Sequence, residues 1–428
     1  MLQSYRRLFA VPHLGSLLFW SLVARLHIGG MPIAVTFLVA GWTGSYAIAG
    51  LVSGALTVGT ALGGPIRGRM ADHRPADRLL AVSAVVYGAG LAVLALLPAS
   101  LWWAAVPLSL VTGVFLPPAS QIARSLWPRV LTGRLRQSMY AAEATLQELL
   151  FIIGPLLAAA VVGVAGGRAG VAVLTAVSCA GALGFAWALR GAGHTLPPSA
   201  AADAAPVPGG ARGSLLADRG ILLVLAMCTL LVAGLGGVDL VMVAWSRELG
   251  SPGYAGVLMA VYAAGSLVGG LVAGGLSGPP RLPRRAFAAA VGVLPLIVLL
   301  PPIAHVPSPW LVAPVLFVAG LAIAPTLAAV TERLGDLAPP HRRGEAFGWL
   351  TTANTAGISV AAPVTGWLID AGGAAAGVAG ATAFALAAAC LSVGVAATRP
   401  AGSGPATGGP PPTGPTGPAG SALPPGAP

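Results

Sequence analysis

Charged residues are scarce in this sequence, which has Asp, Glu, Lys or Arg at only 8% of its 428 positions. A typical soluble domain has about 25% charged residues. Hydrophobic residues make up 56% of the chain, and the mean hydropathy is +0.85. This composition excludes soluble enzymes and disordered scaffolds, and it predicts a protein that crosses the membrane many times.

Lysine is absent, so all 23 basic residues are arginine, against only 12 acidic residues. The net charge of +11 is of the kind seen in nucleic-acid-binding proteins. Here, however, the arginines lie between long apolar runs, which is typical of the connections between transmembrane helices. We therefore expect no nucleic-acid partner.

Cysteine is also rare, with three residues that lie far apart, each inside an apolar run: Cys179, Cys228 and Cys390. No CxxC pair and no nearby histidine accompanies them, so the sequence predicts neither a disulfide nor a metal site. It also lacks the GxxxxGK[ST] loop that cradles nucleotide phosphates, and we expect no cofactor.

The apolar runs predict an all-α membrane protein with twelve transmembrane helices, since a bilayer is crossed by about 20 residues. The predicted spans lie near residues 14–39, 45–66, 79–97, 101–123, 138–163, 170–189, 221–245, 253–276, 286–303, 310–330, 347–369 and 375–397. If both termini lie in the cytoplasm, Arg168 and Arg247 are the only arginines in connections on the outer side of the membrane, and Arg25 is the only one within a span. All the other arginines then lie on the cytoplasmic side. The arginine-, alanine- and glycine-rich composition indicates a bacterial source, hence the inner membrane.

The spans divide into two pseudo-symmetric halves of six. We predict an N-terminal half over 1–190, a cytoplasmic linker over 191–219, a C-terminal half over 220–398 and a disordered Pro- and Gly-rich tail over 399–428. A shift of 206 positions places Gly59 on Gly265 and Gly68 on Gly274. Such a repeat is typical of transporters that move two halves around a central site.

Ionisable residues inside the spans mark a cavity or an ion pair, because they are costly in hydrocarbon. In the first span, Arg25 reaches the predicted midplane and His27 follows it. In the fifth span, Glu148 reaches a similar depth, so we expect Arg25 and Glu148 to pair. Glu148 is then a proton-coupling carboxylate, part of a static ion pair or, if the helix lies at a shallower depth, a residue that faces the cytoplasm. Glu143, which shares a helix face with Gln147, is either an interfacial carboxylate or part of the site.

Two further polar residues lie in the C-terminal half. Asp239, in the outer part of the seventh span, is interpreted either as a cavity carboxylate or cation-binding group, or as a residue in contact with outer-surface water. Asn354 in the eleventh span offers a hydrogen-bonding group. The candidates for substrate binding or proton coupling are therefore Arg25, His27, Glu143, Gln147, Glu148, Asp239 and Asn354.

The connection between the second and third spans contains Gly68, then Asp72 four positions later, then Arg74 and Arg78. It resembles the loop signature of the major facilitator superfamily, and nearly the whole chain resembles the twelve-helix bacterial efflux members of that family. The resemblance implies that Gly68, Asp72, Arg74 and Arg78 form a cytoplasmic gate that locks the two halves together.

Gly154 and Pro155 in the fifth span resemble the core of a motif associated with drug and proton antiporters. Pro363 occupies a similar position in the eleventh span, and we interpret all three as kink or packing positions. The stretches around Pro118 and Trp127 resemble those of an actinobacterial branch of exporters.

We predict a secondary transporter, not an enzyme, that exports a small, amphipathic molecule by alternating access, in antiport with protons that enter through a carboxylate such as Glu148. The alternative is uptake or facilitated transport of a sugar or organic anion, with Arg25 as the anion anchor. A membrane-embedded enzyme and a non-transporting scaffold are minor alternatives, since the sequence offers no catalytic motif in a credible context. The expected partners are the small-molecule substrate, protons and the lipid bilayer, and we expect a monomer.

Overall fold

The computed structural model describes residues 6–8, 10–196, 214–251, 253–275, 281–304 and 308–398. These residues form helices and turns, with no strand among them. The helices of the N-terminal half are α2 (Leu14–Val23), α3 (Met31–Thr43), α4 (Tyr46–His73), α5 (Ala76–Leu96), α6 (Trp102–Val114), α7 (Ala119–Val130) and α8 (Gly133–Gly191). Those of the C-terminal half are α10 (Arg219–Glu248), α11 (Gly253–Gly275), α12 (Leu282–Val293), α13 (Pro295–Leu299), α14 (Ala313–Gly320), α15 (Ile323–Leu337) and α16 (Arg343–Ala397). The predicted tail and residues 197–213 of the predicted linker lie outside the described residues.

The twelve predicted spans are confirmed. Within the described ranges, nine helical segments are long and apolar enough to cross a membrane. Two of them, α8 with 59 residues and α16 with 55, each contain two spans, separated by non-helical residues at Gly166 and at Gly372 and Gly373. The shorter helices α2 and α3 together form the first span, which is broken in the middle.

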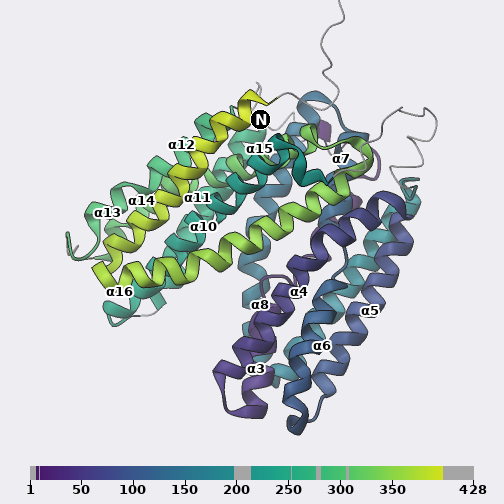
Figure 1. Ribbon diagram of the computed structural model, residues 1–428, viewed down its shortest axis with the longest axis horizontal. Helices are drawn as coiled ribbons and strands as arrows, with labels where there is room; N and C mark the ends of the chain where they lie inside the picture. The colour runs from purple at the N-terminus through teal and green to yellow at the C-terminus, as the bar shows by residue number, and fades with distance from the viewer. Residues whose placement is uncertain are drawn as a thin grey trace, which may run out of the picture.

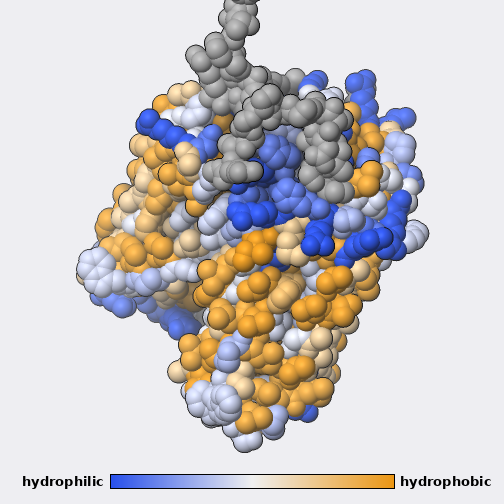
Figure 2. Space-filling view, turned by 45° about the vertical axis from the view of Figure 1, so that its right-hand side comes forward, coloured by the Kyte–Doolittle hydropathy of each residue, from blue (hydrophilic) through white to orange (hydrophobic). Residues whose placement is uncertain are grey.

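The helices form two bundles, one from each half of the chain (Figure 1). The bundles meet at the end of the molecule where α2 begins and α16 ends, and they diverge toward the opposite end. We call these the termini end and the open end. Figure 2 shows hydrophobic side chains over the sides of the bundles and hydrophilic ones gathered at the termini end. Large exposed apolar residues such as Leu96 and Trp187 are suited to contact lipid.

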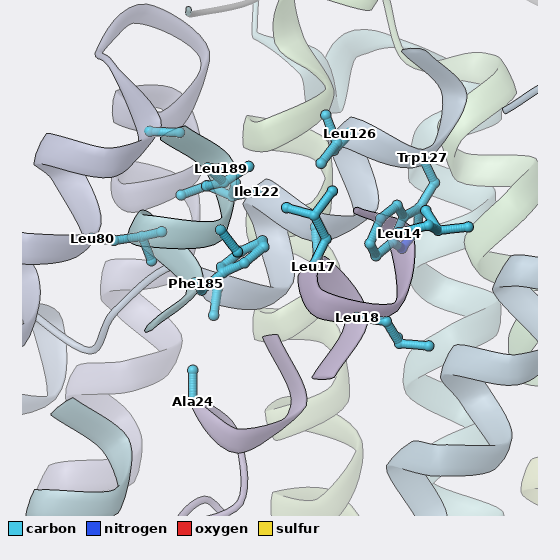
Figure 3. Packing of buried hydrophobic residues seen from close by; sticks show 14 of the residues in the cluster. Leu14, Leu17, Leu18, Ala24, Leu80, Ile122, Leu126, Trp127, Phe185 and Leu189 are labelled. Carbon is cyan, nitrogen blue, oxygen red and sulfur yellow. The ribbon is translucent and has the colours of Figure 1, made fainter. Parts of the chain in front are cut away.

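Four clusters of buried apolar residues hold the bundles together, two in each half. The cluster nearest the site joins Leu14 and Leu17 of α2 to Trp127 of α7 and Phe185 of α8 (Figure 3). Trp127 and Phe185 are both fully buried there. This packing fixes α2 and α7 beside α8, and these three helices surround the candidate functional site described below.

The internal repeat appears as equivalent close contacts in the two halves. A Cβ atom on Gly59 would collide with the carbonyl oxygen of Leu110, and one on Gly265 would collide with that of Phe317. The second and eighth spans therefore approach the fourth and tenth spans in the same way, through backbone that only glycine leaves accessible.

A break in the fourth span explains a buried arginine that the sequence analysis placed in a cytoplasmic connection. Helix α6 ends at Val114 and α7 begins after Pro117 and Pro118, which interrupt the helical hydrogen bonds. Arg67, only 3% exposed, donates to the carbonyl oxygens of Gly113 at 2.8 Å and Val114 at 2.7 Å. Arg67 directly follows the predicted span 45–66 and was therefore expected in the cytoplasmic connection. That expectation was wrong, because α4 continues to His73 and carries Arg67 inside the bundle.

Candidate functional site between the two halves

The break in the first span brings its backbone close to α8. Pro32 lies in the first turn of α3, where its missing N–H costs nothing. A Cβ on Gly154 would lie 2.6 Å from the carbonyl oxygen of Leu26, so glycine is needed for this approach. Pro155 lies beside the same segment, since a Cβ on Gly29 would lie 3.1 Å from its Cδ.

The backbone at Pro155 and Pro363 keeps helical dihedral angles, because the non-helical residues of α8 and α16 are Gly166, Gly372 and Gly373. Pro155 is partly buried against the first span, whereas Pro363 is exposed. Of the two prolines, the structure thus gives Pro155 a packing contact at the site.

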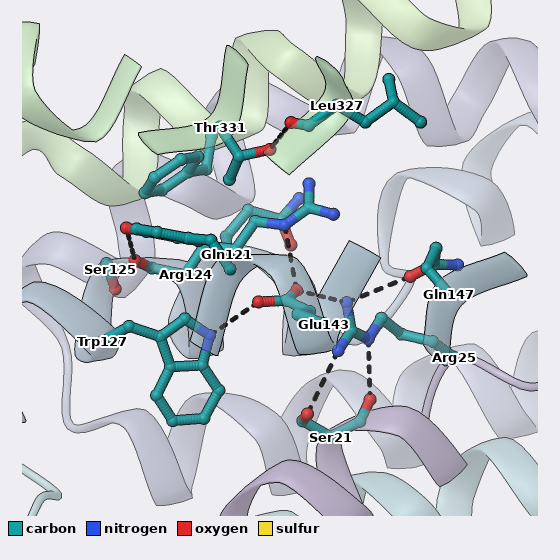
Figure 4. A network of polar contacts seen from close by, with 12 residues as sticks. Ser21, Arg25, Gln121, Arg124, Ser125, Trp127, Glu143, Gln147, Leu327 and Thr331 are labelled. Carbon is teal, nitrogen blue, oxygen red and sulfur yellow. Dashed lines mark hydrogen bonds and ion pairs between the residues drawn. The ribbon is translucent and has the colours of Figure 1, made fainter. Parts of the chain in front are cut away.

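Arg25 lies in the broken segment, and its guanidinium is fixed by neighbouring oxygens (Figure 4). Its Nη1 donates to Oε1 of Glu143 at 2.7 Å and to Oε1 of Gln147 at 3.2 Å. Its Nε donates to the carbonyl oxygen of Ser21 at 2.9 Å, and its Nη2 donates to the Ser21 hydroxyl at 3.2 Å. The side chains of Arg25 and Glu143 are each 2% exposed, so this ion pair is buried.

Glu143 binds two further donors from α7. The Nε of Arg124 donates to its Oε1 at 3.0 Å, and the indole Nε1 of Trp127 donates to its Oε2 at 2.6 Å. One carboxylate therefore balances two guanidinium groups, and the network as a whole carries a net positive charge. Removing one partner of such a buried pair typically costs about 3–5 kcal/mol.

The predicted pair of Arg25 with Glu148 is wrong, and so is an interfacial position for Glu143. Helix α8 begins at Gly133, which places Glu143 well inside the helix and against the broken first span. Glu148 follows five residues later, so it points about 140° away from Glu143 around the helix. It therefore faces a different neighbour.

Glu148 faces the C-terminal half. It lies within electrostatic range of Asp239 of α10, and the hydroxyl of Tyr262 in α11 lies within range of both carboxylates. Both acidic side chains are partly exposed. Neither one has a hydrogen bond or an ion pair with any residue of the described ranges. Each half thus contributes one carboxylate without a partner among the described residues, and the two are close enough to interact electrostatically.

Closer to the termini end, Arg124 extends from α7 toward the C-terminal half. Its Nε is bound to Glu143, while its Nη1 and Nη2 have no partner among the residues that the structure describes. Cys228 of α10 lies within its electrostatic range, and the Cys228 thiol donates to Oδ1 of Asn354 at 3.0 Å. Gln121, almost one turn before Arg124, donates across the halves to the hydroxyl of Thr351 at 3.4 Å.

His27 does not join these residues. It is 2% exposed, its ring centroid lies 5.6 Å from that of Tyr87 in α5, and its Nδ1 has no partner in the described part of the chain. The side chain therefore points into the N-terminal bundle rather than toward the other half. Of the predicted candidates, Gln147 lies with Arg25 and Glu143, Asn354 lies near Arg124, and Glu148 lies with Asp239.

At the termini end, Asp72 joins the two halves. Its Oδ1 accepts from the backbone N–H of Gly344 and its Oδ2 from that of Glu345, both at 2.8 Å. These amides belong to the first turn of α16, whose unpaired N–H groups favour an anion. Gly68 lies against Gly344 so closely that a side chain on either would collide with the backbone of the other.

The arginines beside Asp72 differ from the predicted ones. Arg74 and Arg78 are exposed, and neither side chain has a hydrogen bond or ion pair within the described residues. Arg69 instead donates to Glu345 at 2.7 Å across the halves, and Arg342 donates to the same carboxylate at 2.9 Å. The structure therefore places Gly68 and Asp72 in the contact between the halves, but Arg74 and Arg78 outside it.

A second contact joins the halves where α8 begins. The Ser138 hydroxyl donates to the carbonyl oxygen of Gly274 at 2.8 Å. Arg136 forms ion pairs with Glu332 at 3.5 Å and Asp336 at 3.0 Å, both in α15. Because Gly274 and Ser138 stand at the repeat positions of Gly68 and Gly344, the two contacts are pseudo-symmetric counterparts with different chemistry.

Sequence reasoning missed Arg124, Trp127, Arg69 and Glu345 as members of these networks, because they fall at the ends of predicted spans, where charge is ordinary. The signal available for Arg124 was its position three residues before a tryptophan, on the face of α7 that Trp127 shares.

Comparison with known families agrees with this architecture. Residues 234–423, somewhat less than half of the chain, match the family model described as Major Facilitator Superfamily. No curated protein matches the sequence.

Solved structures show that the fold extends over the whole described chain. A bacterial homologue of the iron transporter ferroportin in the outward-facing state aligns with a TM-score of 0.70 at 15% identity, covering 90% of this chain and 99% of that one. The proton:xylose symporter XylE aligns with a TM-score of 0.64 at 16% identity, covering 88% and 94%. The human organic anion transporter MFSD10 (TETRAN) aligns with a TM-score of 0.64 at 16% identity, covering 90% and 99%. The fold is thus the one shared by these transporters.

Proposed function

We propose that this chain is a secondary transporter of the major facilitator superfamily that works by alternating access. The support is the shared fold, the family match in the C-terminal half, and the division into two bundles that meet at the termini end. The cross-half bonds of Asp72 and Ser138 lie at that end, so the structure corresponds to an outward-facing state if the termini are cytoplasmic. We place the protein in a bacterial inner membrane, as a monomer.

The observation that carries the coupling mechanism is the pair formed by Glu148 and Asp239. Two like charges in a poorly solvated place repel each other, so a proton or a cation that binds between them stabilises the pair. The carboxylates come from opposite halves, and therefore their separation changes when the bundles move. Entry of one proton down a 100 mV potential supplies about 2.3 kcal/mol for such a movement.

Export of a small, amphipathic molecule in exchange for protons is the function that these carboxylates support best. Protons that enter from the open end reach Glu148 and Asp239 first, while a substrate with a cationic group competes for the same carboxylates in the inward-facing state. This competition couples the two fluxes without any nucleotide.

The uptake alternative, with Arg25 as an anchor for a sugar acid or organic anion, has less support. Arg25 is buried and its guanidinium is already bound by Glu143, Gln147 and Ser21. The proteins of similar structure are named for the transport of iron, xylose and organic anions, so this fold does not by itself select a substrate charge.

Proteoliposomes with an imposed pH gradient test the coupling role of Glu148. We expect wild-type vesicles with an acidic lumen to accumulate a fluorescent quaternary ammonium ion, which has no proton to lose and does not follow the pH gradient by itself. The rate with Glu148→Gln should be at least about tenfold lower, equivalent to about 1.4 kcal/mol. Glu248→Gln is the matched control, because Glu248 is exposed at the end of α10. Full pH-driven transport by Glu148→Gln would contradict the proposal.

A further inference from the structure

Arg124 is a cationic group between the halves that has open donors within the described part of the chain. Its Nε is anchored by Glu143 and its Nη atoms have no partner among the described residues. Figure 4 shows the far end of its guanidinium directed away from Glu143. The side chain is 14% exposed, whereas Arg25 is only 2% exposed. A planar guanidinium with two open N–H donors suits a carboxylate or another planar anion, which it binds through paired hydrogen bonds.

The site around Arg124 spans both halves. Cys228 of α10 and Asn354 of α16 lie on the far side, and Gln121 and Thr351 bridge the halves beside it. These groups offer further donors and acceptors to a polar ligand. Since Glu143 compensates Arg25 and Arg124 together, the network keeps one positive charge for a ligand to neutralise.

The negatively charged residues Glu148 and Asp239 lie farther toward the open end than Arg124. Glu143, which holds Arg124, precedes Glu148 by five residues on α8, or about 8 Å along the helix axis. Cys228, near Arg124, precedes Asp239 by eleven residues on α10, or about 16 Å. The positive group and the acidic pair are therefore separated by roughly 8–16 Å along the helices.

We propose that the transported molecule is zwitterionic, with an anionic group bound by Arg124 and a cationic group bound by Glu148 and Asp239. This inference rests on the proposed transport function and names its substrate class. A ligand with both charges connects α7 and α8 of one half to α10 of the other, so it contacts both bundles at once. A molecule with only one of the charges leaves either the guanidinium or the carboxylates without a partner.

Binding of ω-amino acids to the full-length, detergent-purified protein tests the proposal. The probes are 6-aminohexanoate, 8-aminooctanoate and 12-aminododecanoate, each compared by calorimetry with its primary amide, which keeps only the cation, and its N-acetyl derivative, which keeps only the anion. We expect at least one length to bind tenfold to hundredfold more tightly than both derivatives, as for one charge-assisted contact. If no zwitterion of the series exceeds its two derivatives, the proposal is wrong.

Two variants of Arg124 test whether this residue binds the anionic end of the ligand. Arg124→Gln is expected to abolish the preference for the zwitterion over its amide while still binding the amide, which also reports that the variant is folded. Arg124→Lys keeps the positive charge but lacks the planar guanidinium that forms paired hydrogen bonds, so it is expected to retain part of that preference. Arg129→Gln, exposed on the same helix, is the matched control and should bind like the wild type. Unchanged discrimination in Arg124→Gln would overturn the assignment.

The same experiment separates this inference from the proposed function. Asp239→Asn is expected to remove the preference for the zwitterion over its N-acetyl derivative. If zwitterion binding follows these expectations but a pH gradient drives no flux, the coupling is refuted and the site stands. If pH-driven flux of the quaternary ammonium ion persists while the zwitterion preference is absent, the substrate class is refuted and the transport function stands.

Discussion

Replacing Glu143 by glutamine tests the central network most directly. The substitution keeps the size of the side chain but removes the negative charge that Arg25 and Arg124 share. Because Arg25 is 2% exposed, its charge is then left buried without a counter-charge, which costs about 3–5 kcal/mol. At roughly 2–4 °C for each kcal/mol in a unit of 150–250 residues, the Tm should fall by about 6–20 °C.

Thermal unfolding in detergent, followed by tryptophan fluorescence, measures this loss. Glu248→Gln, an exposed substitution of the same type, should leave the Tm unchanged. In the double variant Arg25→Gln with Glu143→Gln, the buried charge is removed together with its partner. Its loss of stability should therefore be smaller than the sum of the single losses, by about 0.5–3 kcal/mol. A Glu143→Gln protein within about 1 kcal/mol of the wild type would show that the pair does not stabilise the fold as argued.

Two further predictions concern the termini end, and distances between spin labels on α4 and α16 measure both. Asp72→Asn removes the charge that binds the amides of Gly344 and Glu345, so the ratio of closed to open molecules should fall by about tenfold, equivalent to about 1.4 kcal/mol. Asp77→Asn, which loses an ion pair within one half, should leave the distance unchanged. Gly348→Ala places a Cβ against the backbone of Gly64 and should hold the ends apart, whereas Gly366→Ala, which faces open space, should not. Wild-type distances in Asp72→Asn or Gly348→Ala would contradict the respective contact.

The sequence predicted the spans well because their signal is local. A run of about 20 apolar residues is visible without knowledge of its neighbours, and the repeat of Gly59 at Gly265 reflects equivalent packing in both halves. The first span was also found, and Gly29, Gly30 and Pro32 mark the place where it is broken between α2 and α3.

The site was harder to predict because it depends on which face of each helix meets which neighbour. Glu148 was expected to pair with Arg25 because both were predicted at a similar depth in the membrane. In the structure, the face of α8 that is turned toward Arg25 carries Glu143 instead. Arg124 and Glu345 lie where predicted spans end, and only the packing of α7 and α16 shows that their side chains turn inward. The contacts of Arg25 with Glu143 and of Arg69 with Glu345 join residues more than a hundred positions apart.

The contact of Gly64 and Gly68 with Gly348 and Gly344 joins the halves through bare backbone. Since none of these residues has a side chain, parting and rejoining this surface involves no change of rotamers and releases no side-chain entropy. The free-energy difference between the joined and separated states then depends mainly on a few directional bonds, those of Asp72 and Arg69 above all. The strength of such a surface can be adjusted by single polar substitutions that leave the packing of the glycines unchanged.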